Sequence, residues 1–444
     1  MSPGKRRLAG WVLAAAGLAL VGLWVLIGFS TYEQDLAGLE RSESLLKSLG
    51  KGLGLAAAVL ILFQFALSAR FKWLDRVLPL NSSLNLHGLV GPLAACLAAL
   101  HPLFLFATPD YPLGPVTWRH WPEVLGGLAL TGLWFIVASS RGRRFLKLEY
   151  QSWRRLHGLV FPVTGLIVIH AAARGSDIKS GLPLGLGLVL IAAYGGIFVW
   201  VKRIKAGRLR GSPFPVLAVE RLGPKVTALT LGAPQGIDFK HSPGQFALIK
   251  PLESGLEQEE HPFTISSPSG EKGSISFAIK ASGDFSGSVD RLKPGDIFQV
   301  DGPYGQFGYL FHPSVELIFI AGGIGITPMM SMLRHMARTG EGPPVTLIWS
   351  NRSREDMVFK DELEELGQRL ADLTTHLVLS RDPDWEGPKG RLDKNLLEEL
   401  LAGVDKQARF FVCGPPAMME AITRDLKRLG YPSGRIHTER FSFI

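Results

Sequence analysis

The chain has 444 residues, enough for roughly two to four domains, with a formal net charge of +9 and a positive mean hydropathy of +0.19. Its apolar residues are concentrated before residue 202, which argues against an ordinary water-soluble protein. Because the arginines cluster between apolar runs, the charge indicates membrane topology and argues against nucleic-acid binding. Two cysteines in different halves, Cys96 and Cys413, exclude a disulfide framework and a CxxC metal motif.

Six segments of the first half are long and apolar enough to cross a bilayer, whose core requires about 20 apolar residues per helix. They are residues 9–29, 53–69, 84–106, 122–139, 156–173 and 182–201. The first resembles a signal peptide, but its apolar run is too long and lacks a small-residue cleavage site. We therefore expect six retained spans.

The loops between these spans differ in charge. One set, which includes both ends of the region, carries 17 lysines and arginines, and the other set carries 6. Positively charged loops remain in the cytoplasm, so we expect both termini, and everything from about residue 211 onward, on the cytoplasmic side.

Histidines occupy matched positions in the third span (His87 and His101) and in the fifth (His157 and His170). Ionisable residues inside a membrane are costly and usually functional. A spacing of 14 residues places the first two on one helix face, about 21 Å apart. Both spans run outward, so His87 is expected to face His157 and His101 to face His170. Each facing pair can hold one haem iron.

Two points remain open for these histidines. In an ideal helix the fifth-span residues are about 140° out of phase, so a change of winding near Pro162 would be needed. A lone membrane histidine can also bond a neighbouring helix or shuttle protons, as in a haem-free transporter or proton channel. Zinc is disfavoured because no carboxylate or thiol is near enough to complete a tetrahedral site.

The second half has two patterns. Between residues 214 and 311, short β-type runs alternate with Gly/Pro turns, which predicts a small antiparallel barrel. From Val315 onward, strands alternate with helices, which predicts a doubly wound parallel sheet. The expected domains are a transmembrane helix bundle (1–210), a barrel (211–312) and an α/β domain (313–444).

A glycine-rich turn, GGIGITP, follows a buried strand and precedes a helix. Its glycines (Gly322, Gly323 and Gly325) allow the backbone to approach a pyrophosphate, whose charge the helix N-terminus favours. The turn is not a full GxGxxG motif. A second turn, CGPPAMM, is expected at the same sheet edge, where ligands bind in such folds.

In combination and order, HPFTISSP, AIKASGDFSGSV, GPYGQFG, AGGIGITPMM and FVCGPPAMM resemble the ferredoxin–NADP reductase fold. Joined to six spans with paired histidines, the chain from about residue 50 onward resembles bacterial NADPH oxidases and ferric reductase-type transmembrane flavocytochromes b. The resemblance implies FAD, NADPH or NADH, two haems b, and a bacterial-type inner membrane. The implied haem ligands are His87, His101, His157 and His170.

In HPFT, the resemblance implies that Phe263 packs on one flavin face and that Thr264 hydrogen-bonds near the reactive flavin nitrogen. His261, followed by Pro262, takes a place near the FAD phosphates. The segment implied to donate hydrogen bonds to those phosphates comprises Gly283, Ser286 and Gly287.

In the α/β domain, the implied pyrophosphate loop comprises Gly322, Gly323, Gly325 and Thr327. The implied turn beside the nicotinamide comprises Cys413, Gly414 and Pro415. Ser380 and Arg381 resemble the pair that reads the adenosine 2′-phosphate, and Arg352 is another candidate. A guanidinium there favours NADPH, although NADH-using relatives can keep arginines.

The tail TERFSFI resembles the family's acidic–x–aromatic ending. Phe441 would cover the second flavin face until the nicotinamide displaces it, with Phe443 as a rival, and Glu439 would lie near the flavin edge. The expected catalytic residues are therefore Phe441, Cys413, Thr264 and Glu439.

The resemblance implies electron transfer from cytoplasmic NAD(P)H to an outer acceptor, either O2, giving superoxide, or a ferric chelate. One turn after His101 stands Leu105 rather than a second histidine, so part of the oxygen-site pattern is missing. Lys51 could supply the cation of an oxygen site or could simply extend to the membrane interface. Arg119 and His120 could serve either acceptor. The sequence has no EF-hand loop or Pro-rich tract, so we expect activity without calcium or an activator protein.

Overall fold

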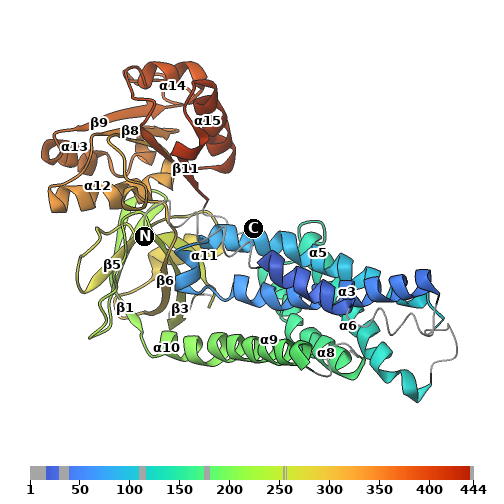
Figure 1. The fold of residues 1–444 in the computed structure, drawn as a ribbon. Coiled ribbons are helices and arrows are strands. Elements are labelled where there is room, and N and C mark those ends of the chain that lie inside the picture. The colour runs from blue at the N-terminus through green and yellow to red at the C-terminus, as the bar shows by residue number, and fades with distance from the viewer. Residues whose placement is uncertain are drawn as a thin grey trace. The chain divides into compact units, whose positions relative to one another are not determined.

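The computed structural model describes residues 17–29, 40–109, 117–174, 181–253, 256 and 258–440. The chain divides into two compact units at Lys205 and Ala206. The first contains the apolar helices, and the second contains the barrel and the α/β lobe (Figure 1).

The membrane unit has five described helical segments long and apolar enough to span a bilayer: Arg41–Ser68, Leu80–Phe106, Trp118–Arg141, Tyr150–Arg174 and Pro183–Arg210. Their elements are α3 (Arg41–Ser68), α5 (Leu80–Phe106), η1 (Trp118–His120), α6 (Trp121–Arg141), α7 (Tyr150–His157), α8 (Val160–Arg174), α9 (Gly181–Val199) and η3 (Trp200–Lys205). The short helix α4 (Lys72–Asp75) lies between the first two segments, and α10 (Ala206–Arg210), at the end of the last, belongs to the second unit. Of the predicted first span, the described part is the helix Gly17–Gly28, and residues 9–16 lie outside the described residues.

Small residues let these helices approach closely. A Cβ atom added to Gly132 of α6 would lie 2.7 Å from the Val163 side chain of α8. One added to Gly50 of α3 would lie 3.0 Å from the side chain of Leu105 of α5. Dispersion contacts between tightly packed helices stabilise membrane bundles, where water provides no driving force. The buried core of this bundle comprises Ile61, Ala94, Ala95, Leu133, Ile136 and Val163.

The fifth predicted span is broken between α7 and α8. Gly158 and Leu159 form a turn, after which the helix resumes at Val160. Pro162 has no N–H to bond the carbonyl of Gly158, which is instead bonded by Phe161 at 3.3 Å. This break provides the change of winding that was expected near Pro162, because His157 and His170 are out of phase in an ideal helix.

The barrel of the second unit is antiparallel. Its strands are β1 (Phe214–Gly223), β2 (Val226–Gly232), β3 (Phe246–Glu253), β4 (His261–Thr264), β5 (Ser274–Lys280) and β6 (Ile297–Tyr304), in the order β4-β3-β6-β1-β2-β5. A bridge between Ile265, the residue after β4, and Phe277, in the middle of β5, closes the sheet. Between β5 and β6 lie α11 (Asp284–Ser288) and η4 (Val289–Arg291), and η5 (Tyr309–Phe311) follows β6.

The α/β lobe has a five-stranded parallel sheet in the order β11-β10-β7-β8-β9. The strands are β7 (Leu317–Gly322), β8 (Val345–Asn351), β9 (Leu373–Leu379), β10 (Arg409–Cys413) and β11 (Ile436–Glu439). The helices are η6 (Gly323–Ile326), α12 (Thr327–Thr339), η7 (Arg354–Asp356), α13 (Lys360–Arg369), α14 (Lys394–Leu400), α15 (Pro416–Arg428) and η8 (Ser433–Arg435). One core lies under α12 and α13 and another under α14 and α15, so the sheet is covered on both faces (Figure 1).

The segment after HPFT connects the barrel to the α/β lobe. The carbonyl of Ser266 accepts from Arg334 at 2.6 Å, and that of Ser269 accepts from Arg338 at 2.5 Å. Arg334 is itself paired with Glu362 of α13 at 2.6 Å. These bonds hold the end of the predicted flavin motif against helix α12, which begins at the glycine-rich turn.

Candidate functional site

The outer histidine pair is formed by α5 and α8. The ring centroids of His101 and His170 lie 6.3 Å apart. His101 Nδ1 bonds the carbonyl of Gly50 at 2.8 Å, and His170 Nδ1 bonds that of Pro122 at 2.7 Å. A carbonyl oxygen can only accept, so each Nδ1 carries the hydrogen and each Nε2 keeps its lone pair.

The inner pair has the same arrangement. The ring centroids of His87 and His157 lie 5.9 Å apart, and His87 Nδ1 is 3.3 Å from the carbonyl of Gln64. His157 Nδ1 lies 3.3 Å from Ser140 Oγ. That hydroxyl donates to Ile136 and accepts from the indole of Trp153 at 3.1 Å, so it accepts from His157 as well. On His157, Nε2 therefore keeps its lone pair.

Both pairs fit a metal ion between two imidazoles. Centroid separations near 6 Å leave room for a metal–nitrogen bond of about 2 Å on each side. A Cβ added at Gly88, Gly91 or Gly165 would meet no described atom within 4 Å. Within the described residues, no three His, Cys, Asp or Glu side chains form a cluster of metal-ligand type. The two pairs therefore match the donor set of axially ligated haem.

Glycines set the position of the outer pair. A Cβ on Gly54 of α3 would lie 2.7 Å from His101 Nδ1, and a Cβ on Gly126 of α6 would lie 2.9 Å from His170 Cε1. Both distances are too short for real carbon atoms. Each imidazole therefore packs against the backbone of a neighbouring helix at a glycine, a contact that the sequence pattern does not predict.

The four residues of HPFT form strand β4 on the barrel. The ring of His261 stacks on that of Phe285, with centroids 3.9 Å apart and planes 11° apart. Its Nε2 is buried and has no hydrogen-bond partner among the described residues. Burial lowers the pKa of His261, so the ring is neutral at pH 7. A buried nitrogen without a partner at this position fits a site that a polar ligand completes.

The segment expected to face the FAD phosphates is a short turn and helix. Ser286 Oγ accepts from the backbone N–H groups of Ser282 and Gly283, at 2.9 and 3.0 Å. The N–H of Gly287 bonds the carbonyl of Gly283 at 2.7 Å. Phe285, inside this segment, provides the ring under His261. The sequence pattern does not single out Phe285, because it does not indicate which ring an aromatic side chain will contact.

The two glycine turns of the α/β lobe lie against each other. A Cβ on Gly325 would collide with the carbonyl of Cys413, and a Cβ on Gly414 would lie 3.1 Å from the Gly322 backbone. The carbonyl of Gly323 accepts from the buried indole of Trp349 at 2.9 Å. Thr327 begins α12 directly after the turn, and Pro415 lies beside Gly322. The pattern is a backbone cradle without room for side chains, as a dinucleotide site requires.

Three expected catalytic residues lie in one region. Cys413 and Glu439 are paired on adjacent strands, and Cys413 Sγ lies 3.6 Å from the Glu439 carbonyl oxygen. A Cβ on Gly305 of the barrel would lie 3.6 Å from Glu439 Oε2 and 3.0 Å from the ring of Phe246. Phe246 is the strand partner of Thr264. Burial, followed by the charge of Glu439, raises the pKa of the Cys413 thiol well above its usual range.

The residues expected at the adenosine phosphate lie at the other end of the same sheet edge. Arg352, Ser380 and Arg381 are exposed and follow strands β8 and β9. The N–H of Ser380 donates to the Asn351 carbonyl, and that of Arg381 donates to the Arg352 carbonyl, both at 3.0 Å. Four strand spacings, about 19 Å, separate β9 from β11, a span suited to an extended dinucleotide. Phe441 and Phe443 lie outside the described residues.

Three families match the chain in succession. Residues 53–168 match the ferric reductase like transmembrane component, residues 212–307 match an FAD-binding domain, and residues 319–424 match the oxidoreductase NAD-binding domain. These ranges fall on the membrane helices, the barrel and the α/β lobe.

Individual relatives match about half of the chain. A glycine betaine monooxygenase reductase subunit of Pseudomonas aeruginosa is 34% identical over 47% of this chain and 58% of its own length. NADH-cytochrome b5 reductase 1 of Dictyostelium discoideum is 31% identical over 44% of this chain and 69% of its own. A solved ferredoxin NADP+ reductase of Neisseria gonorrhoeae, with FAD and NADP bound, has a TM-score of 0.46 at 22% identity over 52% of this chain and 98% of that one. The chain thus spans about six tenths of the length of the first of these relatives.

Proposed function

Because the chain belongs to the ferric reductase-like membrane oxidoreductases and has an input module of the ferredoxin–NADP reductase type, we propose that it moves electrons from cytoplasmic NADPH across the membrane to O2, producing superoxide. The observation that carries this proposal is the pair of facing imidazole sets, with ring centroids 5.9 and 6.3 Å apart. When bound, FAD accepts a hydride and releases single electrons, and haem carries one electron at a time.

In this proposal the two histidine pairs provide the axial ligands of two b-type haems. The inner haem is held by His87 and His157, and the outer haem by His101 and His170. Hydrogen bonds at Nδ1 fix the rings of His101, His157 and His170, and would leave Nε2 of each free to bind iron. The helix break at Gly158 and Leu159 allows one chain segment to serve both haems.

The input residues have complementary roles. Gly322, Gly323 and Gly325 let the backbone reach the dinucleotide pyrophosphate, and Arg352 and Arg381 bind the adenosine phosphate. Cys413 remains a neutral thiol beside the nicotinamide because its pKa is raised. Thr264 and Glu439 lie at the flavin edge, where they orient the ring. We assign both chain termini to the cytoplasmic side of a bacterial-type inner membrane.

Ferric chelate is the second candidate acceptor, favoured by the family that residues 53–168 match. Near the outer pair, the guanidinium of Arg174 is paired with Glu123, one residue after the Pro122 carbonyl that holds His170. Such a cation would attract an anionic chelate as readily as it would stabilise superoxide. Arg174 therefore does not distinguish the two acceptors, and the experiment below does.

The test is an absorption spectrum of detergent-purified protein with FAD, recorded without oxygen before and after NADPH, and again after air is admitted. We expect a reduced b-type haem spectrum that reoxidises in air, with dye reduction that superoxide dismutase suppresses. Reduced haem that persists in air but is oxidised by ferric chelate would establish the second candidate. A protein without a Soret band would contradict both and support the haem-free transporter.

A further inference from the structure

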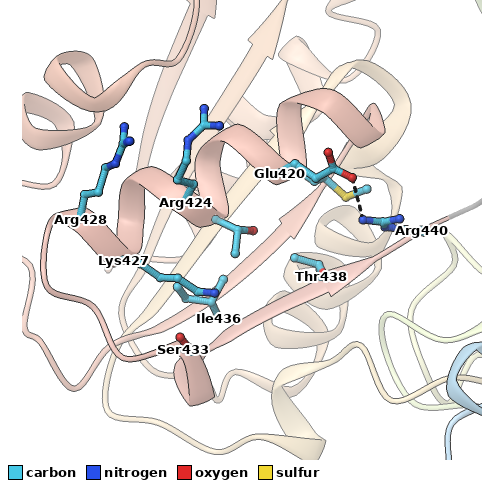
Figure 2. Close-up of a pocket in the computed structure, with 10 residues that line it drawn as sticks. Glu420, Arg424, Lys427, Arg428, Ser433, Ile436, Thr438 and Arg440 are labelled. Atoms are coloured by element: carbon cyan, nitrogen blue, oxygen red, sulfur yellow. Dashed lines mark hydrogen bonds and ion pairs between the residues drawn. The ribbon is translucent and has the colours of Figure 1, made fainter.

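A basic groove lies on the α/β lobe between helix α15 and strand β11. It has a volume of about 660 Å³. Its lining residues are Met419, Glu420, Thr423, Arg424, Lys427, Arg428, Ser433, Ile436, Thr438 and Arg440. Four of these are cationic and one is acidic, and no role in electron transfer has been assigned to any of them (Figure 2).

The helix presents its polar stripe to this groove. Glu420, Thr423, Arg424, Lys427 and Arg428 recur at the spacing of one helix face, whereas Met419, Ile422 and Leu426 face the core. The stripe is about 12 Å long, from eight residues of helical rise. Figure 2 shows the cationic ends of these side chains spread apart along the helix. A single phosphate would require them to converge, so an extended anion fits better.

One ion pair in the groove is exchangeable. Arg440 is paired with Glu420 at 3.0 Å, with side chains 56% and 63% exposed. Exposed ion pairs contribute little stability, so a ligand carboxylate can replace this one at small cost. Arg424 and Arg428 share one buried carboxylate, Asp425, at 3.7 and 3.3 Å. Because a guanidinium has five N–H donors, both arginines can keep Asp425 and still bind a ligand carboxylate. Among the residues that the structure describes, the ammonium group of Lys427 has no ion-pair partner.

The opposite wall of the groove is the edge strand of the sheet. β11 pairs with β10 on one side and has no described strand on the other. Ile436 and Thr438 lie two residues apart and both line the groove. A groove between a helix and an edge strand is the geometry in which an extended peptide adds to a sheet as a further strand. Backbone hydrogen bonds give affinity there, and alternate side chains give specificity.

From these features, we propose that the groove binds an extended acidic peptide of a partner protein, added alongside β11, with carboxylates at alternate positions facing Arg424 and Lys427. Alternate residues of a strand are about 6.6 Å apart, close to the 5–6 Å between neighbours on a helix face. Because the groove is separate from the residues assigned to electron transfer, the proposal stands whichever acceptor the protein uses. The peptide is a docking ligand, and nothing in the proposal makes it an activator.

The test is fluorescence anisotropy of the full chain in neutral detergent, with FAD, against a labelled heptapeptide that alternates glutamate with valine. We expect saturable binding that weakens as salt is raised. Lys427→Glu should weaken binding about tenfold, because it opposes the ligand charge. Lys360→Glu, the same charge change on α13, should leave binding within about twofold. Retained flavin content shows that each variant is folded.

A second peptide, N-methylated at the central valine and at the glutamate after it, keeps the charge but lacks one N–H group on each side of the strand, so it cannot complete the backbone ladder. We expect it to bind at least about tenfold more weakly, since it loses hydrogen bonds and the extended pairing. Equal binding of the two peptides would overturn strand addition. Equal competition by inorganic phosphate or by phosphatidylglycerol vesicles would identify a general anion or lipid surface and would also overturn the proposal. So would the absence of binding to the unaltered protein.

Discussion

The ring centroids of His101 and His170 lie 6.3 Å apart, and the Nδ1 atom of each ring is bonded to a main-chain carbonyl of a different neighbouring helix. Gly50 of α3 holds the first ring and Pro122 of α6 holds the second. Four helices therefore cooperate to present two nitrogen lone pairs to one point. Several expected outcomes depend on this arrangement.

Replacing His101 with leucine should remove about half of the bound haem, since one of two ligand pairs is lost. Acceptor reduction should stop, while flavin reduction by NADPH continues. Haem per flavin, measured as the pyridine haemochrome, checks the first point, and anaerobic flavin bleaching checks the second. His120→Leu is the control, because His120 caps an outer turn through Thr117 and belongs to neither pair. Unchanged haem content in His101→Leu would contradict the ligand assignment.

Adjacent glycines on α6 provide a sharper comparison. Gly126→Ala places a methyl group 2.9 Å from His170 Cε1, whereas Gly127→Ala meets nothing within 4 Å. We expect the first variant to displace the His170 ring and lower outer-haem occupancy severalfold, because overpacking of this size typically costs about 1–3 kcal/mol. The second should bind haem normally. Equal haem content in the two variants would show that the ring is not confined by α6.

The contact between the two glycine turns predicts a cofactor effect. Gly325→Ala would drive a methyl group into the carbonyl of Cys413, so the turn must shift. We expect the KM for NADPH to rise about tenfold or more, in line with about 1.4 kcal/mol of lost binding. Gly367→Ala, on α13 with nothing within 4 Å, is the control and should keep the original KM. Steady-state flavin reduction with NADPH measures both.

The raised pKa of Cys413 predicts a loss of stability at high pH. The folded state holds the thiol proton more tightly than the unfolded chain does. The stabilisation is therefore complete below the unfolded pKa of about 8.5 and declines above it, by up to about 1.4 kcal/mol per pH unit. Cys413→Ala should flatten the fall in melting temperature between about pH 8.5 and 10. Cys96→Ala should leave the fall as it is.

The hydroxyl of Ser140 should set the potential of the inner haem. It accepts from His157 Nδ1, and such a bond makes the ligand more basic and favours ferric iron. Ser140→Ala should raise the inner midpoint potential by roughly 20–60 mV, equivalent to one hydrogen bond of about 0.5–1.5 kcal/mol. Ser139→Ala removes a buried hydroxyl that bonds only the Ile136 carbonyl and should leave the potential unshifted. Spectroelectrochemical titration distinguishes the two.

The histidine positions could be predicted from the sequence because ionisable residues stand out in apolar spans. The phase of the fifth span could not. Pro162 removes one N–H donor, but sequence does not fix whether the helix kinks, tightens or breaks. The structure settles this with a turn at Gly158 and Leu159, stabilised by packing of both flanking segments. Five long apolar helices were predicted correctly, and the first span is described only in part.

In the second unit, the turns were predicted correctly, but their contact was not. Gly325 meets Cys413 because β10 lies beside β7, and strand order depends on crossovers that no local pattern encodes. The stacking of His261 on Phe285 was missed for a related reason. The sequence around an aromatic residue does not indicate which ring it will contact, because that contact forms only when the barrel closes. The antiparallel barrel and parallel sheet followed from the periodicity of their strands.

The different acceptors at Nδ1 have an evolutionary consequence. The rings of His101 and His170 are held by peptide oxygens, which every amino acid possesses, so no codon change at Gly50 or Pro122 can remove the acceptor itself. His157 depends on a serine hydroxyl that a single nucleotide change can remove. The His87/His157 end of the bundle is thus open to gradual adjustment by mutation of an acceptor. At the His101/His170 end, a mutation has to displace a ring or the backbone that holds it.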